Sequence, residues 1–377
     1  MTEPSHITHN VMSGSAHTVV QAGTVVFGAT GDMPVDEAVR DLTPLFADVL
    51  SDGFTGRQWL IDQIDAFLAE RRCGYLWVEG DAGVGKTALA AHLVRERGWP
   101  GHFSRLTRGG SARGALRNLA GQLAREHGLV PDGLLPERWC TPEGFESLLA
   151  RIPAQVVLVV DGADEAEQVA GAQPWGLPLE LPPGVFVVGT YRTGSPPPKT
   201  GSVLRLTAAD PRNIADVASH VARVQPDGDL VTRCGGVWVY LRYVLNEIRQ
   251  GVRSATDPLP PDLTAYYVEN LERWSRSDWQ NILPIISTLT AAGEPLGAQQ
   301  LAQLSQVDEQ VVREHCHRTL RPFLGAVDGQ AGRGFAWYHA SLREFLTGIY
   351  PGCDASDQAW RWWETLSSAT VAAHNRI

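Results

Sequence analysis

The periodicity of hydrophobic and polar residues divides the chain into segments with different expected structures. Residues 1–33 are rich in Ser, Thr, Gly, His and Asn and lack helical periodicity. Helical patterns follow over residues 35–50 and 60–68, and between about 74 and 200 apolar runs alternate with helical patterns. This alternation predicts right-handed β–α–β units, in which helices cover both faces of a parallel sheet.

Nearly uninterrupted apolar runs mark the strands expected in this sheet. Residues 75–78, 156–160 and 185–190 have the composition of strands that are buried on both faces. The proline-rich stretch 195–198 indicates a loop near the edge of the domain. A shorter strand is expected over 101–106, with helices over 88–94 and 112–127. The predicted fold class is therefore α/β, with a doubly wound sheet.

The second half of the chain is mostly helical in pattern. Residues 210–250 give two helical patterns, the second over 237–248, and a proline-rich linker follows at 257–261. Several short helices precede two β-prone runs around a Gly-rich turn, and this order predicts a winged-helix unit. An amphipathic pattern from Trp360 reaches Ile377 without a cap or breaker, which is typical of a shortened chain.

Composition narrows the possible functions. The chain has 377 residues and a formal net charge of −10, which argues against general binding to nucleic acid or to anionic membranes. Its five cysteines lack CxxC spacing, as is usual in a reducing compartment. No apolar run approaches the roughly 20 residues of a membrane span, and no signal peptide opens the chain. We therefore expect a cytoplasmic protein.

The segment from Gly80 to Thr87 matches the Walker A pattern G-x-x-x-x-G-K-[ST], between a predicted strand and a predicted helix. Its glycines allow backbone N–H groups to surround phosphate oxygens at the N-terminus of the helix. Lys86 is expected to bind the β- and γ-phosphates, and Thr87 to place its hydroxyl on Mg²⁺. The expected nucleotide contacts come from Gly80, Asp81, Ala82, Gly83, Val84, Gly85, Lys86, Thr87 and Ala88.

Acidic residues follow the apolar run 156–160 in a Walker B arrangement, on a strand expected next to the one before the phosphate loop. Asp161 would bind Mg²⁺, and Asp164 or Glu165 would orient and deprotonate the attacking water. Arg192 follows the run 185–190 and is expected to pair with the γ-phosphate. Because no Asn-Lys-x-Asp motif appears, adenine is the favoured base, and ATP or ADP with Mg²⁺ the favoured ligand.

With these motifs the chain resembles the STAND class of P-loop ATPases, and most closely the NACHT type, over roughly residues 54–350. Phe54-Thr55-Gly56-Arg57 resembles a motif of that class whose arginine lies near the nucleotide, which assigns that role to Arg57. Residues 338–346 resemble the winged-helix signature that carries a histidine. The resemblance implies that His339 contacts the β-phosphate of ADP and holds a closed state.

The chain departs from that class at two places. Relatives carry Gly-x-Pro near the adenine, whereas the corresponding residues 234–240 contain no proline, so the adenine contacts are open. Relatives also continue into a repeat array that senses a ligand, and this chain ends before such an array.

The N-terminal segment carries a resemblance of its own. Val20-Gln21-Ala22-Gly23 is similar to the core of amyloid signalling motifs related to the RHIM. A glutamine in this position can form a ladder between stacked copies, while valines fill a dry interface. The resemblance implies an effector protein with a matching N-terminal motif; the alternative is a disordered leader.

The motifs predict an ATP hydrolase, and the two resemblances imply that it is slow and regulatory, acts in bacterial immunity or programmed cell death, and oligomerises on nucleotide exchange. The alternatives are an AAA or origin-recognition-like DNA-associated ATPase and a scaffold that binds nucleotide without hydrolysing it. The expected domains are a flexible tail with a β-prone signalling motif (1–33), a P-loop NTPase domain with N-terminal helices (34–206), a helical lid (207–256), and a winged helix with following helices (257–377).

Overall fold

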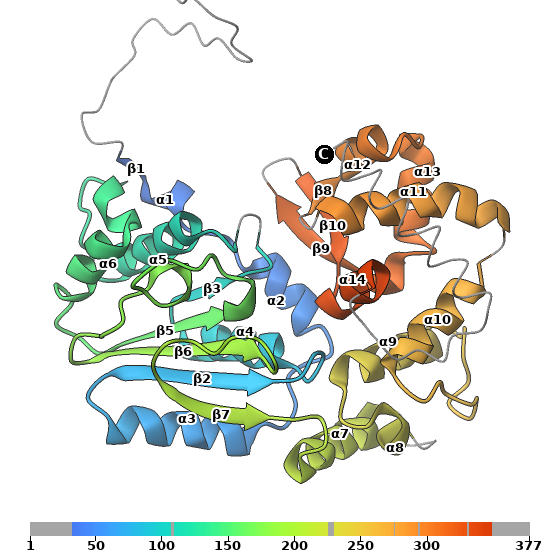
Figure 1. Ribbon diagram of the computed structural model, residues 1–377, viewed down its shortest axis with the longest axis horizontal. Helices are drawn as coiled ribbons and strands as arrows, with labels where there is room; N and C mark the ends of the chain where they lie inside the picture. Colours follow the sequence, from blue (N-terminus) through green and yellow to red (C-terminus); the bar gives the residue numbers. More distant parts are fainter. Residues whose placement is uncertain are drawn as a thin grey trace, which may run out of the picture.

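A five-stranded parallel sheet forms the first half of the molecule (Figure 1). The computed structural model describes residues 32–348 except 107–108, 225–229, 275, 293–294 and 330–331. The strand order is β3-β5-β6-β2-β7, and every neighbouring pair is parallel. The strands are β2 (Gly74–Gly80), β3 (Gly101–Phe103), β5 (Val156–Asp161), β6 (Val185–Arg192) and β7 (Ser202–Leu206).

Helices cover both faces of this sheet, which confirms the predicted α/β class. Alternate side chains of β2 divide between the faces: Leu76 and Val78 pack with α3 and α4, whereas Tyr75 and Trp77 pack with α5 and α6. The helices of this half are α1 (Val35–Ala38), α2 (Thr43–Val49), α3 (Gln58–Glu70), α4 (Lys86–Arg97), α5 (Ala112–Glu126) and α6 (Pro142–Leu149), and a small ribbon pairs β1 (Met33–Pro34) with β4 (Leu134–Leu135).

The strand order corrects one prediction. The sequence suggested that the strand ending at Asp161 lies next to the strand before the phosphate loop, but β6 lies between β5 and β2. The register pairs Gly80 of β2 with Arg192 of β6. Arg192, rather than Asp161, is therefore the immediate neighbour of the phosphate loop along the sheet.

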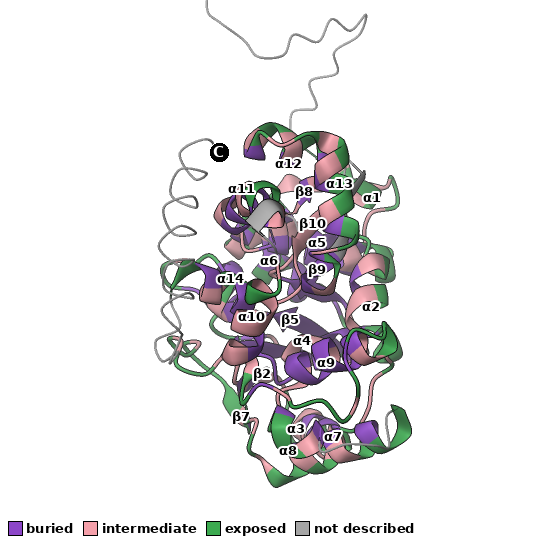
Figure 2. Ribbon diagram, turned by 90° about the vertical axis from the view of Figure 1, so that its right-hand side faces the viewer, coloured by how far each residue is buried: buried purple, intermediate pink, exposed green. Residues whose placement is uncertain are grey.

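The second half is helical with a small antiparallel sheet, in the order β8-β10-β9. One continuous hydrophobic core runs through it from Val217 to Leu346. Figure 2 shows buried residues along α9 and β5, and exposed ones on the outer faces of α7 and α8. Its elements are α7 (Pro211–Val224), α8 (Leu230–Cys234), α9 (Trp238–Arg249), α10 (Leu263–Glu272), α11 (Arg276–Ala292), β8 (Leu296–Gly297), α12 (Ala298–Ser305), α13 (Glu309–His317), β9 (Leu324–Gly329), β10 (Gly332–Trp337) and α14 (Ala340–Thr347).

Three helices, not the predicted two, occupy the region around residues 210–250. The additional boundary lies between the end of α7 at Val224 and the start of α8 at Leu230. The boundary before the second predicted pattern falls at Gly235 and Gly236, whose φ angles of 55° and 81° lie in the left-handed region. This break ends α8 and allows α9 to begin in a new direction at Trp238. None of the described helices is long and apolar enough to cross a bilayer. The motif at Val20–Gly23 and the pattern from Trp360 lie outside the described residues.

Candidate functional site

The phosphate loop joins β2 to α4 as its sequence predicts. Gly83 and Gly85 have φ angles of 75° and 94°, which only glycine adopts readily, and α4 begins at Lys86. The Lys86 ammonium donates to the carbonyl oxygens of Gly80 at 2.6 Å and Asp81 at 2.9 Å. Burial lowers the pKa of Lys86, whereas the nearby carboxylates of Asp161 and Asp164 favour its charged form. The loop therefore holds a cation at the N-terminus of a helix.

The loop also contacts the second half of the molecule. The Val239 backbone N–H donates to the carbonyl oxygen of Gly83 at 3.1 Å. A Cβ atom at Gly83 would lie 2.4 Å from Cγ1 of Val239, so only glycine permits this approach. Figure 1 shows the carboxyl ends of the sheet strands pointing toward α9 and α14. The phosphate loop is thus enclosed between the sheet and the first turn of α9.

Asp161 lies buried at the end of β5 and accepts a hydrogen bond from the Thr190 hydroxyl at 2.6 Å. The Thr87 hydroxyl lies close enough to this carboxylate to stabilise its charged form. Burial raises the pKa of Asp161, and both threonine hydroxyls and the charge of Lys86 oppose this rise. A hydroxyl and a carboxylate side by side are oxygen ligands of the kind that Mg²⁺ prefers. The residues predicted to hold the metal therefore lie together and fit it.

The acids after Asp161 have separate partners. Glu165 accepts a hydrogen bond from the Ser104 hydroxyl at 2.8 Å; the residue is exposed as a whole, but burial of its carboxyl group raises the pKa of Glu165. Asp164 accepts the backbone N–H of Arg192 at 3.1 Å. Only Oε2 of Glu165 accepts the hydrogen bond from Ser104, and Oε1 accepts none in these contacts. Asp164 instead holds the backbone of Arg192 at the end of β6. This geometry makes Glu165 the better placed of the two for activating water.

Arg57 is almost fully buried beside the phosphate loop and has a φ angle of 64°, which is unusual for a residue with a side chain. Its Nη2 donates to the carbonyl oxygen of Val84 at 2.6 Å, and its guanidinium carbon lies 5.5 Å from the centre of the Trp238 ring. Its backbone N–H is held by Asp216 at 2.9 Å. Burial lowers the pKa of Arg57 to about 10. Nη1 is buried without a partner among the described residues, as a ligand-binding nitrogen would be.

His339 lies at the N-cap of α14, where its Nδ1 accepts the backbone N–H of Ser341 at 3.1 Å. Partial burial and the charges of Lys86 and Arg192 lower the pKa of His339 to about 3, so the ring is neutral at pH 7. Because Nδ1 is an acceptor, the ring proton resides on Nε2. His339 can therefore donate one hydrogen bond from Nε2.

Arg192 pairs with Glu344 of α14, and neither side chain is fully exposed. The pair connects the sheet edge beside the phosphate loop with the helix that His339 begins. Sequence analysis assigned Arg192 to a γ-phosphate and did not identify Glu344.

One cavity is lined by seven of the fifteen predicted site residues. Its lining combines the phosphate loop, the segment before α3, helix α9 and the segment before α14, so that residues distant in sequence face one space. Gly80 to Ala82 and Val84, the acids Asp161, Asp164 and Glu165, and Arg192 do not line it. The predicted residues in the lining are Arg57, Gly83, Gly85, Lys86, Thr87, Ala88 and His339, joined by Phe54, Arg105, His220, Trp238 and Arg242.

Sequence analysis missed a polar cluster at one end of this cavity. Arg105 and Arg242 both pair with Asp48 of α2, each at 3.3 Å, and Arg242 also donates to the Tyr338 hydroxyl. Trp238, which stands in the stretch that lacks the expected proline, donates to Asn213 at 2.9 Å. Asp48, Arg105 and Arg242 belong to none of the motifs found in the sequence, and only the fold brings them together with Tyr338.

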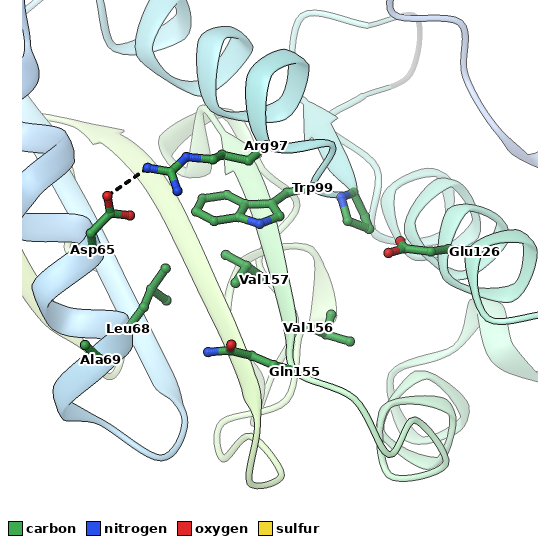
Figure 3. Close-up of a pocket in the computed structure, with 10 residues that line it drawn as sticks. Asp65, Leu68, Ala69, Arg97, Trp99, Glu126, Gln155, Val156 and Val157 are labelled. Carbon is green, nitrogen blue, oxygen red and sulfur yellow. Dashed lines mark hydrogen bonds and ion pairs between the residues drawn. The ribbon is translucent and has the colours of Figure 1, made fainter.

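A second cavity of about 380 Å³ lies at the opposite edge of the sheet, around Trp99 and Val157 (Figure 3). The ion pair between Asp65 and Arg97, at 2.7 Å, stands at one side of it. None of the predicted site residues lines this cavity.

Comparison with known proteins agrees with the ATPase motifs. Residues 53–173 match the family model of the AAA ATPase domain. Among curated proteins, no sequence matches this chain significantly.

Solved structures give weaker similarities. A signal transduction ATPase with numerous domains (STAND) and a tetratricopeptide repeat sensor, from Pyrococcus horikoshii, is 15% identical over 86% of this chain and 47% of its own, with a TM-score of 0.45. The chain thus spans about half the length of that protein. The RuvB Holliday junction branch migration motor of Thermotoga maritima is 17% identical over 75% of this chain and 93% of its own, with a TM-score of 0.32.

The parallel sheet, the phosphate loop and the family match agree with one another. Residues 53–173 carry the phosphate loop of a P-loop ATPase and are similar to the AAA ATPase domain.

Proposed function

We propose that this chain is an ATP/ADP-dependent signal-transduction switch of the STAND class, similar to the NACHT type. One observation carries the proposal: Lys86 of the phosphate loop and His339, at the start of α14, line the same cavity. A nucleotide held there would touch both halves of the molecule. Its exchange would then change how the halves are held together.

In the closed state, ADP is bound by the phosphate loop and by His339. The neutral His339 ring would donate a hydrogen bond from Nε2 to the β-phosphate, and Lys86 would supply positive charge to the phosphates. Arg57, whose Nη1 is buried without a partner among the described residues, gives a further donor. Together these groups make ADP a bridge between the sheet and the helical half.

Hydrolysis of ATP would be slow and would reset the switch. Thr87 and Asp161 would hold Mg²⁺, which neutralises phosphate charge when it is bound. Glu165 would take a proton from the attacking water. Asp164 would position Arg192 by accepting a hydrogen bond from the backbone N–H of Arg192. Lys86 and Arg192 would stabilise the charge that develops on the transferred phosphate.

Opening would separate the two halves and expose a surface for oligomerisation. The proposed winged helix comprises α11 to α13 with β8 to β10, and α7 to α9 form the proposed lid. An oligomer would gather the N-terminal segments at high effective concentration, so that Val20–Gly23 seeds cross-β assembly with an effector. Such a device suits bacterial immunity or programmed cell death.

A DNA-associated ATPase is the second candidate. The ion pairs of the arginines on and after α13 argue against DNA binding. The arginines of a DNA-reading helix need free guanidinium groups for phosphates and bases. On and after α13, Arg313 pairs with Glu309 at 2.6 Å and Arg318 with Glu314 at 3.0 Å. A salt-dependent shift of duplex DNA at micromolar protein would favour this second candidate.

Mass photometry of the full-length chain with ADP or with AMPPNP tests the proposal. The chain contains two lysines, Lys86 and Lys199, which gives a matched pair of variants. We expect a monomer with ADP and larger assemblies with AMPPNP for the wild type and for Lys199→Ala, but no response for Lys86→Ala. A chain that stays monomeric with every nucleotide would contradict the proposal.

A further inference from the structure

The ion pair between Arg192 and Glu344 lies at the end of β6, beside the first residue of the phosphate loop in the sheet. Arg192 ends β6 in register with Gly80, the first residue of the phosphate loop, and its backbone N–H is fixed by Asp164. Its guanidinium binds Glu344, whose side chain is 20% exposed. Arg192, which lies next to the phosphate loop in the sheet, is therefore already paired with the carboxylate of Glu344.

Charges of both signs surround this pair: Lys86 and Arg192 are the cations, and the carboxylates of Asp161 and Asp164 also act on Lys86. Lys86 and Arg192 both act on the ring of His339, and Arg192 disfavours the charged form of Lys86. Glu344 neutralises one of these charges. Helix α14 begins at its N-cap His339 and contains Glu344 in its second turn, so one rigid element carries both groups. A group that pulls Arg192 away from Glu344 therefore also releases a contact of the helix that His339 begins.

We infer that Glu344 makes the closed cleft selective for a nucleoside diphosphate over a triphosphate, because it holds the arginine that a γ-phosphate would bind. This inference rests on the proposed function and names a regulatory residue for it. A diphosphate leaves the ion pair intact. A triphosphate must compete with Glu344 for Arg192, and breaking the pair removes one of the contacts that hold α14 against the sheet edge.

Competition binding measures this selectivity directly. Nucleotide is removed from the full-length chain, fluorescent N-methylanthraniloyl-ADP is bound, and ADP or AMPPNP displaces it. Glu344→Gln keeps the shape of the side chain and removes its charge, so the ion pair that holds Arg192 to α14 is lost. We expect the affinity for AMPPNP relative to ADP to rise about tenfold, a usual size for coupling between sites.

Three further variants make the result specific. Glu309→Gln removes a carboxylate from an exposed ion pair on α13 and should leave the affinity ratio unchanged. Glu344→Asp keeps the charge on a shorter side chain, and its ratio should lie between those of the wild type and Glu344→Gln. In an Arg192→Gln background, Glu344→Gln should no longer raise the ratio, because the arginine that it frees is missing.

The outcomes separate the inference from the proposed function. If the variants bind nucleotide but Glu344→Gln and Glu344→Asp keep the wild-type ratio, the inference is overturned and the switch proposal stands. A gain that persists in the Arg192→Gln background overturns the role of the ion pair. A wild-type chain that binds neither nucleotide overturns both.

Discussion

The guanidinium carbon of Arg242 lies 3.8 Å from the centre of the Tyr338 ring. The same side chain donates to the backbone carbonyl of Asp48 at 2.8 Å. Arg242 belongs to α9, Asp48 to α2 and Tyr338 to the segment before α14, so one arginine connects three parts of the chain at the edge of the nucleotide cavity. In our account this arginine helps to keep the cleft closed.

Arg242→Ala should therefore open the cleft more often and release ADP faster. A partly buried cation–π contact and the hydrogen bonds to Asp48 together predict an increase of about tenfold in the release rate. Stopped-flow chase of N-methylanthraniloyl-ADP measures this rate. Arg313→Ala, which removes an arginine from an exposed ion pair, is the control. Equal release rates for the two variants would contradict a closing role for Arg242.

Glu165 should be required for hydrolysis but not for binding. Glu165→Gln removes the general base while it keeps an acceptor for the Ser104 hydroxyl, so turnover should fall by about 10²- to 10⁴-fold with ADP affinity unchanged. Asp164→Asn should have a smaller effect, because Asp164 holds the backbone of Arg192 instead of facing water in our assignment. Phosphate release under single-turnover conditions gives the rates, with Glu180→Gln as an exposed control. A larger loss in Asp164→Asn would reverse the two roles.

Gly235 and Gly236 allow a matched test of whether the close backbone approach before α9 requires a glycine. Both have positive φ angles, but a Cβ atom at Gly236 would lie 1.9 Å from the carbonyl oxygen of Ala208, whereas one at Gly235 meets nothing within 4 Å. Gly235→Ala should cost roughly 1–2 kcal/mol of backbone strain. Gly236→Ala should cost more and displace Trp238 from the cavity. Chemical denaturation and nucleotide affinity measure the two effects; equal values for both variants would show that this close approach is absent.

Stability should depend on pH through His102. Burial lowers the pKa of His102 to about 4, against about 6.5 in an unfolded chain, and Nε2 contacts the carbonyl oxygen of Gly109 at 2.7 Å. As the pH falls below about 6.5, the unfolded chain takes up a proton that the folded chain does not. The free energy of unfolding should therefore fall by roughly 1.4 kcal/mol per pH unit between about 6.5 and 4 from this group.

Urea denaturation at several pH values measures that slope. His102→Gln keeps a hydrogen-bonding side chain that does not titrate, and its stability should fall less steeply over the same range. Parallel slopes for wild type and variant would exclude His102 as the cause.

The sequence predicted the site residues whose contacts are local in the chain. It missed those whose partners are far away in the sequence. Lys86 binds the carbonyl oxygens of residues five and six positions away, so a local motif identifies it. Arg242 and Asp48 are 194 residues apart and belong to no motif. The insertion of β6 between β2 and β5 was missed for a related reason. Each parallel strand has the same apolar pattern, which specifies burial on both faces but not the neighbour.

Identification of the nucleotide that the purified chain carries tests the central claim most directly. Freshly purified wild-type protein is denatured with acid, and the released nucleotide is quantified by ion-pair chromatography. A closed cleft bridged by ADP predicts close to one ADP per chain and slow turnover of added ATP, with His339→Ala retaining less. An empty site combined with rapid ATP turnover would contradict the switch and favour a motor-like or DNA-associated ATPase.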